Sequence, residues 1–195
     1  MKQRTIALRE RGVASAVALL AEQGVAGLTT RTVAQRAEAS VPAIYEVFGD
    51  KAGLIREVFF HGFQLLGHDL ESLPTTPDPL ADLRTLAQTF RAFVTANPVL
   101  AEVMFSQPFA DFAPTSQDNK AGTKVSGVFL DRTRAAIDAG LIHGQPKDVA
   151  HVFFAFVQGL AAAESAQRFG RTTQETNRRW QLGLDAIIRG LSPNS

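Results

Sequence analysis

Hydrophobic residues recur every three or four positions along most of the chain, a spacing that places them on one face of an α-helix. The alternation of hydrophobic and polar residues that marks a half-buried strand is missing. Short groups of Gly, Pro, Ser and Thr interrupt the helical pattern at intervals. The pattern therefore predicts an all-α fold of about nine helices.

Local signals set the expected limits of these helices. Glycine ends a helix at Gly24 and at Gly140, and Asn97-Pro98 opens another. The clearest break is the proline-rich run over residues 74–79, and a loop is predicted over residues 106–117. The predicted helices span residues 5–23, 30–37, 41–48, 51 to beyond 66, 80–96, 98–105, 118–139, 146–169 and 174–190.

Three helix starts follow one another closely in the first third of the chain. Thr29, Ser40 and Asp50 each precede a predicted helix, and their side-chain oxygens can accept a hydrogen bond from a free amide of its first turn. Leu28 and Val33 occupy the two positions of a hydrophobic staple around the first of these starts.

Two helices of about two turns each bury little surface alone, so both must pack on the first helix. Val33, Ala34 and Ala37 offer a face of small side chains, and Ile44 and Phe48 offer larger apolar ones. The sequence thus predicts a helix-turn-helix whose last short helix could enter a DNA major groove, which is about 12 Å wide. The outward face of that helix carries Val41, Ala43, Tyr45 and Glu46.

This segment resembles the DNA-binding domain of the TetR (tetracycline-repressor) family of transcriptional regulators. Glu38-Ala39 departs from the Gly-Val that the family usually has in the turn. The resemblance implies a DNA-binding domain over residues 1–49 and a regulatory domain over residues 50–195 that binds a ligand and dimerises. The matching residues are Thr30, Val33, Ala34, Ala37, Ser40, Ile44, Tyr45, Phe48, Lys51 and Leu54.

The resemblance also implies roles for single residues. Thr30, Tyr45 and Lys51 would contact the phosphate backbone. Val41, Pro42, Ala43 and Glu46 would face base edges. Alternatively, the Tyr45 ring packs on the first helix and Ser40 serves only as a cap. The predicted DNA-binding set is Thr29, Thr30, Arg31, Ser40, Val41, Pro42, Ala43, Tyr45, Glu46 and Lys51.

The C-terminal part of the chain is rich in phenylalanine. Residues 153, 154 and 156 are all phenylalanine and fall on more than one helix face, so their helix should be buried on two sides. In the resembled family, the last two long helices of two chains form a four-helix bundle. The residues predicted in this dimer interface are Phe154, Leu160, Trp180, Leu184 and Ile187.

An effector pocket is predicted among the helices that start near residues 80, 98, 118 and 148. An aromatic lining with few charges favours a small apolar or aromatic effector. The alternative is that these phenylalanines are ordinary core residues. The predicted lining residues are Phe90, Phe93, Met104, Phe105, Phe129 and Phe153.

Charge and composition bear on the remaining function classes. Residues 1–51 carry seven basic and five acidic residues, a tilt compatible with phosphate contact. The absence of cysteine, of a G-x-S-x-G or H-E-x-x-H motif and of a phosphate-binding glycine loop argues against an enzyme. Asp78 and Asp82 are interpreted as the solvated first turn of a helix, and His61 and His68 lack a third metal ligand.

A DNA-binding repressor released from a palindromic operator by its effector is thus the leading hypothesis. A helical adaptor that binds only protein is the main alternative, and the spacing of Tyr45 and Lys51 argues against it. The charged first residues and the shortness of every apolar run predict a cytoplasmic protein that contacts no membrane. No cofactor or metal is expected.

Overall fold

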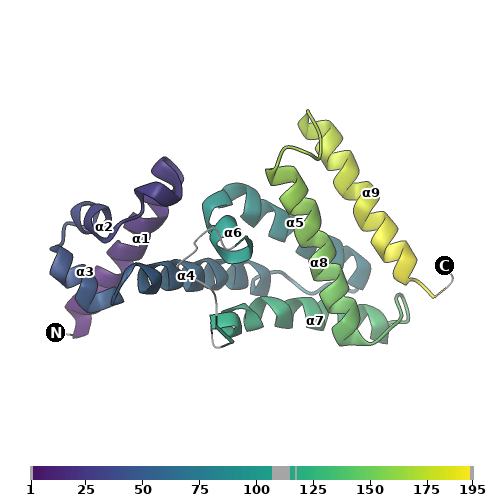
Figure 1. Ribbon diagram of the computed structural model, residues 1–195. Helices are drawn as coiled ribbons and strands as arrows, with labels where there is room; N and C mark the ends of the chain where they lie inside the picture. The colour runs from purple at the N-terminus through teal and green to yellow at the C-terminus, as the bar shows by residue number, and fades with distance from the viewer. Residues whose placement is uncertain (1, 107–114, 117, 194–195) are drawn as a thin grey trace. The chain divides into compact units, whose positions relative to one another are not determined.

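The computed structural model describes residues 2–106, 115–116 and 118–193 (Figure 1). Within these ranges the chain has nine α-helices, one 3-10 helix and no strand, which confirms the predicted all-α fold. The helices are α1 (Lys2–Gly27), α2 (Thr30–Arg36), α3 (Val41–Phe48), α4 (Lys51–Glu71), α5 (Pro79–Ala96), α6 (Pro98–Phe105), η1 (Asp118–Gly122), α7 (Thr123–Asp138), α8 (Pro146–Ser165) and α9 (Thr173–Leu191).

The chain folds into two compact units. The first comprises Met1–Leu65 and Asn97–Ala121, and thus contains α1 to α3, most of α4, and α6. The second comprises Leu66–Ala96 and Gly122–Ser195, with α5 and α7 to α9. The predicted boundary between residues 49 and 50 separates a DNA-binding domain from a regulatory domain, whereas the two compact units are defined by packing. That boundary therefore stays a prediction.

Two predicted helices are shorter in the structure. The helix predicted from residue 118 begins as η1, because the Asp118 carboxylate accepts hydrogen bonds from the Thr115 N–H (2.9 Å) and the Arg56 guanidinium (3.0 Å). Helix α8 ends at Ser165 instead of residue 169, because Gln167 takes a left-handed φ of 55° that no α-helix accommodates. Most of the predicted loop over residues 106–117 lies outside the described residues.

Aromatic rings from three helices form the core of the second unit. Helices α5, α7 and α8 pack on one another, and Phe90, Phe129 and Phe154 come one from each. The Phe129 and Phe154 ring centroids are 4.9 Å apart, and the Phe90 ring meets both edge-on at 6.4 and 5.6 Å. Such edge-to-face contacts stabilise the core beyond the burial of the rings. Phe153 joins this cluster at 6.1 Å from Phe129.

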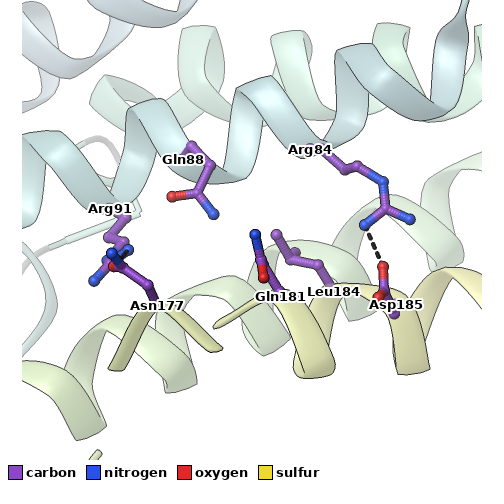
Figure 2. A pocket seen from close by; sticks show the side chains of 7 residues that line it. All are labelled: Arg84, Gln88, Arg91, Asn177, Gln181, Leu184 and Asp185. Atoms are coloured by element: carbon purple, nitrogen blue, oxygen red, sulfur yellow. Dashed lines mark hydrogen bonds and ion pairs between the residues drawn. The ribbon is translucent and has the colours of Figure 1, made fainter. Parts of the chain in front are cut away.

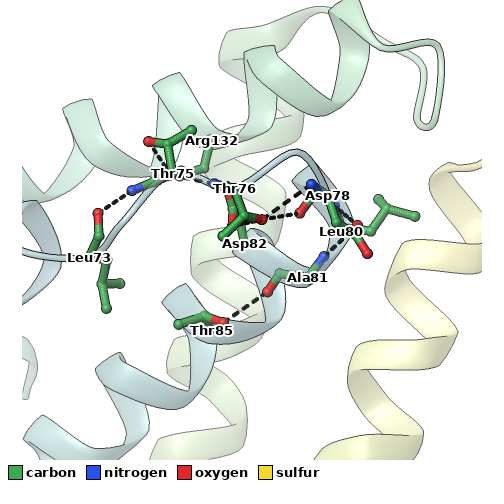
Figure 3. Close-up of polar contacts among 9 residues, drawn as sticks. All are labelled: Leu73, Thr75, Thr76, Asp78, Leu80, Ala81, Asp82, Thr85 and Arg132. Carbon is green, nitrogen blue, oxygen red and sulfur yellow. Dashed lines mark hydrogen bonds and ion pairs between the residues drawn. The ribbon is translucent and has the colours of Figure 1, made fainter.

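A buried ion pair fixes the segment that leads into α5 (Figure 3). The Asp82 carboxylate is only 7% exposed and accepts hydrogen bonds from the Thr76 hydroxyl (2.8 Å), the Thr76 N–H (3.0 Å) and Arg132 (3.1 Å). Arg132 of α7 also donates to the Thr75 hydroxyl and to the Leu73 carbonyl. Burial alone raises the pKa of Asp82, but the hydrogen bonds from Thr76 and the charge of Arg132 outweigh it, so the pKa lies below its ordinary value.

The interpretation of Asp78 and Asp82 as a solvated pair is therefore wrong for one of them. Asp78 is exposed, and its carboxylate accepts hydrogen bonds from the Leu80 and Ala81 N–H groups in the first turn of α5. Asp82 lies one turn later and faces the interior, where Arg132 neutralises it. Asp78 thus caps the start of α5, whereas Asp82 forms a buried ion pair with α7.

The described part of the chain lacks two further classes of feature. No helix there is both long and apolar enough to cross a bilayer. No cluster of three or more His, Cys, Asp or Glu side chains there could hold a metal ion.

Candidate nucleic-acid interface

Helices α1, α2 and α3 pack against one another around a small apolar core (Figure 1). Val33, Ala34, Ala37 and Ile44 are each at most 2% exposed, and Phe48 is also buried, as the sequence predicts. The approach of α3 to α1 depends on a glycine, because a Cβ atom at Gly12 would lie 2.6 Å from the Phe48 ring.

All three predicted N-caps are present. The Thr29 hydroxyl accepts from the Thr32 N–H (3.1 Å), and the Thr32 hydroxyl accepts from the Thr29 N–H (3.1 Å), which makes a reciprocal capping box. The Ser40 hydroxyl accepts from the Ala43 N–H at 3.3 Å. The Asp50 carboxylate accepts from the Gly53 N–H at 2.7 Å. These caps fix where α2, α3 and α4 begin.

The turn between α2 and α3 contains a residue in the left-handed region. Glu38 has a φ of 51°, and the following N–H, that of Ala39, bonds back to the Ala34 carbonyl at 2.9 Å. Glycine adopts this conformation freely, whereas a residue with a Cβ atom is strained there by about 1–2 kcal/mol. The departure from the Gly-Val pattern therefore leaves the turn geometry in place.

The face of α3 and its flanks is open. None of the ten predicted DNA-contact residues is buried. Tyr45 is 49% exposed, so its ring does not pack into the core, and its hydroxyl accepts a hydrogen bond from the Thr30 hydroxyl at 3.4 Å. This contact brings two predicted phosphate ligands, one from the start of α2 and one from α3, to the same place. Ser40 caps α3 and is also exposed.

Ion pairs divide the basic residues of this unit into two groups. Arg36 pairs with Glu22 through two contacts of 2.6 Å, and Arg9 pairs with Glu57 at 2.7 Å. In the described part of the chain, exposed Arg31 in the first turn of α2 has no such carboxylate partner. Its guanidinium charge is thus available to an external anion at the N-terminal end of α2.

Two residues of the predicted dimer interface are covered by their own chain. Trp180 is fully buried, because its indole N–H donates to Glu164 at 2.7 Å and the Arg91 guanidinium lies 5.1 Å from the centre of its ring. Leu184 is 2% exposed. We therefore remove these two residues from the predicted interface. Phe154, Leu160 and Ile187 are half-buried and stay in it as a prediction.

Exposed apolar side chains on α8 and α9 indicate which residues replace the buried ones in the predicted dimer interface. Val152 of α8 and Leu182 of α9 are 52% and 68% exposed, although a lone large apolar side chain is favoured inside a protein. The sequence analysis missed both residues because apolar residues fall on more than one face of each of these helices, so periodicity could not distinguish the outer from the inner side.

The six predicted pocket residues do not form one group within a single unit. Phe90, Phe93, Phe129 and Phe153 belong to the second unit and are each at most 3% exposed. Met104 and Phe105 belong to the first unit. Phe129 also lines a cavity between α7 and α8.

Two family models match the sequence. Residues 13–58 match a model described as bacterial regulatory proteins of the tetR family. Residues 83–187 match a model described as the tetracyclin repressor-like C-terminal domain, and this match alone spans more than half of the chain. A comparison with curated proteins found no match.

Several solved structures have a similar fold. A protein of unknown function from Rhodococcus sp. RHA1 gives a TM-score of 0.81 at 26% identity, and the match covers 95% of each chain. A bacterial regulatory protein in the tetR family from Rhodococcus RHA1 gives 0.71 at 16% identity, over 95% of this chain and 97% of that one. The tetR-family regulator PfmR from Thermus thermophilus gives 0.70 at 17% identity, over 93% and 99%.

Proposed function

This chain belongs to the tetR family of bacterial regulatory proteins and is a DNA-binding transcriptional regulator, and we propose that it is a repressor released from its operator by a small effector. The observation that carries the proposal is the open face of α3, next to which Thr30 and Tyr45 share a hydrogen bond. We propose that the protein acts on double-stranded operator DNA in the cytoplasm, and we propose no catalytic activity for it.

Contacts of two kinds follow from this face. Thr30, Arg31, Tyr45 and Lys51 hold phosphates, which sets the register of α3 on the duplex but carries no sequence information. Val41, Pro42, Ala43 and Glu46 of α3 meet base edges, where an alanine or proline can contact a thymine methyl group and a glutamate can accept from a cytosine amino group. Thr29 and Ser40 complete the set.

Removal of a phosphate ligand should weaken DNA binding, and removal of a charged ligand should also change its salt dependence. We expect Tyr45→Ala and Lys51→Gln each to weaken binding to a duplex that the wild-type protein selects from a random library. Lys51→Gln should also reduce the slope of log K against log salt by about 0.9 for the phosphate that the side chain no longer neutralises, whereas Tyr45→Ala removes a neutral hydroxyl and should leave the slope unchanged. Fluorescence anisotropy from about 50 to about 300 mM salt measures both quantities.

Arg36→Gln is the matched control, since it removes the same charge from a residue that Glu22 already neutralises. Its slope should stay within experimental error of the wild-type value. The proposed contacts are refuted if Tyr45→Ala and Lys51→Gln bind the duplex as tightly as Arg36→Gln does, or if Lys51→Gln and Arg36→Gln share one slope.

We propose a homodimer built from α8 and α9. Exposed Val152 and Leu182 lie on these two helices, together with half-buried Leu160 and Ile187. The two helices approach closely, because a Cβ atom at Gly183 of α9 would lie 3.2 Å from the Leu160 side chain of α8. A two-fold axis through this face would bury the same apolar patch on both chains and would match a palindromic operator.

Leu182→Glu should separate the two chains. A two-fold interface repeats the substitution, so two losses of about 1.4 kcal/mol each raise the dimer Kd about 100-fold. Sedimentation velocity over a range of concentrations measures this constant. Gln181→Glu introduces the same charge at the neighbouring exposed position, outside the apolar face, and should leave the Kd within about threefold of wild type. Equal behaviour of the two variants, or a wild-type monomer, contradicts the proposed interface.

Effector release requires a link between the regulatory part of the chain and α3. Helix α4 begins two residues after the α3 C-cap Gly49 and supplies residues to both compact units, so its displacement is our proposed link. A hundredfold weakening of DNA binding requires about 2.7 kcal/mol of coupling free energy, which the effector must supply through its preference for one state.

A further inference from the structure

A cavity of about 220 Å³ lies between α7 and α8 in the second unit. Its walls are mostly apolar and include Phe129 and Leu130 of α7 and Ala150 and Phe154 of α8. The two aromatic rings meet at 69° with centroids 4.9 Å apart, so they form a fixed corner. A dry cavity of about 150 Å³ is known to hold benzene. This one therefore has room for a single aromatic ring with a short substituent.

Two basic side chains of α8 also line this cavity. Lys147 and His151 are one helical turn apart, and no acidic residue is among the lining residues. The His151 Nδ1 atom lies 2.8 Å from the Lys147 carbonyl oxygen, to which it donates a hydrogen bond. When Nε2 also carries a proton, its N–H can donate to a carboxylate. Within the described residues, the Lys147 ammonium has no carboxylate partner. The cavity thus combines apolar walls with positive charge.

A second, larger cavity offers a useful contrast. It has a volume of about 530 Å³ and lies between α5 and α9 (Figure 2). Both of its arginines already have carboxylate partners: Arg84 contacts Asp185 at 2.5 Å, and Arg91 contacts Glu164 at 2.7 Å. An anion would have to displace these internal partners. The smaller cavity between α7 and α8 presents no such competition.

We infer that the cavity between α7 and α8 binds a small aromatic monocarboxylate, with its ring against Phe129 and Phe154 and its carboxylate at Lys147 and His151. A neutral ring would leave the two basic groups without an anion, and a free inorganic anion would leave the apolar walls uncovered. A ligand with a long acyl chain would exceed the volume. That this ligand is also the effector is a second step, and only this step rests on the proposed function.

Direct binding without DNA tests the cavity. We expect benzoate, phenylacetate or 3-phenylpropanoate to raise the melting temperature and to bind in isothermal titration calorimetry. The matching amides, which keep the ring but lose the charge, should bind at least about tenfold more weakly. Lys147→Gln should weaken carboxylate binding by about tenfold and leave amide binding unchanged. Because Lys147 is exposed, the variant should fold normally.

Lys124→Gln is the matched control. It removes an equal charge from an exposed lysine of α7 that does not line this cavity, so carboxylate binding should not change. The inference is overturned if none of the three carboxylates binds, if the amides bind as tightly, or if Lys147→Gln has no effect. A change in dimer Kd for Lys147→Gln, without carboxylate binding, would assign the cavity to the partner chain instead and would also overturn it.

A separate measurement distinguishes this inference from the proposed function. The carboxylate that binds is added to the complex of the protein with its selected duplex. Binding to the protein without release of the duplex refutes the effector role and leaves the cavity assignment intact. If an apolar compound releases the duplex and Lys147→Gln does not change that release, the result supports an effector-released regulator and places the effector outside this cavity.

Discussion

Replacing Gly53 with alanine is expected to abolish operator binding and to lower the free energy of unfolding by about 3 kcal/mol or more. A Cβ atom at this position would lie 1.9 Å from the carbonyl oxygen of Phe48, the last residue of α3. That oxygen belongs to the backbone and cannot rotate away as a side chain could. The Asp50 cap, at 2.7 Å from the Gly53 N–H, holds the α3–α4 corner in this geometry. Relief of the overlap must therefore displace α3.

Gly67→Ala in the same helix is the control. There the nearest atom to an added Cβ is that of Lys124 at 3.5 Å, an ordinary contact. Alanine is a better helix former than glycine, so this variant should be more stable by about 0.5–1 kcal/mol. Urea unfolding followed by circular dichroism measures both variants, and anisotropy with the selected duplex measures binding. Equal stability of the two variants would show that the corner tolerates a side chain.

Asp82→Asn is the second substitution with a large expected effect. The asparagine keeps the size of the side chain but leaves Arg132, which is only 11% exposed, without its counter-charge. Breaking a buried pair in this way costs about 3–5 kcal/mol. Asp78→Asn should cost less than about 0.5 kcal/mol, because asparagine caps a helix as well as aspartate does. The two substitutions are chemically identical and four residues apart, so their difference in urea unfolding isolates the effect of burial.

The pH dependence of this difference has a definite sign. The pKa of Asp82 in the folded chain is below its ordinary value of 3.8, so the folded state favours the charged form. Its stabilisation is complete above pH 3.8 and is lost as the pH falls through the lower, folded-state pKa. The gap between wild type and Asp82→Asn should therefore stay constant from about pH 7 to about pH 5 and close in stronger acid. A gap that widens in acid would contradict this account.

The sequence could predict what is decided locally. The caps at Thr29, Ser40 and Asp50 are interactions with a backbone amide three residues ahead, so a short window of sequence contains both partners. The length of α3 and the open face that it presents follow from those caps and from a simple hydrophobic period. This is why the helix-turn-helix and its exposed face were accessible from the sequence alone.

Features decided by distant partners could not be predicted in this way. The burial of Asp82 depends on Arg132, fifty residues further along the chain, and the 3-10 helix η1 begins at Asp118, which accepts a bond from the distant Arg56. Likewise, the apolar arc of α9 predicts that Trp180 packs somewhere, but only the positions of Arg91 and Glu164 show that it packs inside. The basic pair that lines the α7–α8 cavity was missed because the sequence pattern does not show which exposed basic residues border a cavity.

The positions of Trp180 and Tyr45 make the two compact units distinguishable by their intrinsic fluorescence. The chain has one tryptophan and one tyrosine, and Trp180 lies in the second unit whereas Tyr45 lies in the first. Excitation at the red edge of the absorption band selects the indole alone, so its emission follows only the regulatory part. The phenol ring on the open face of α3 reports separately on the part that meets DNA. A single unlabelled sample therefore shows whether a ligand or a substitution loosens one unit before the other.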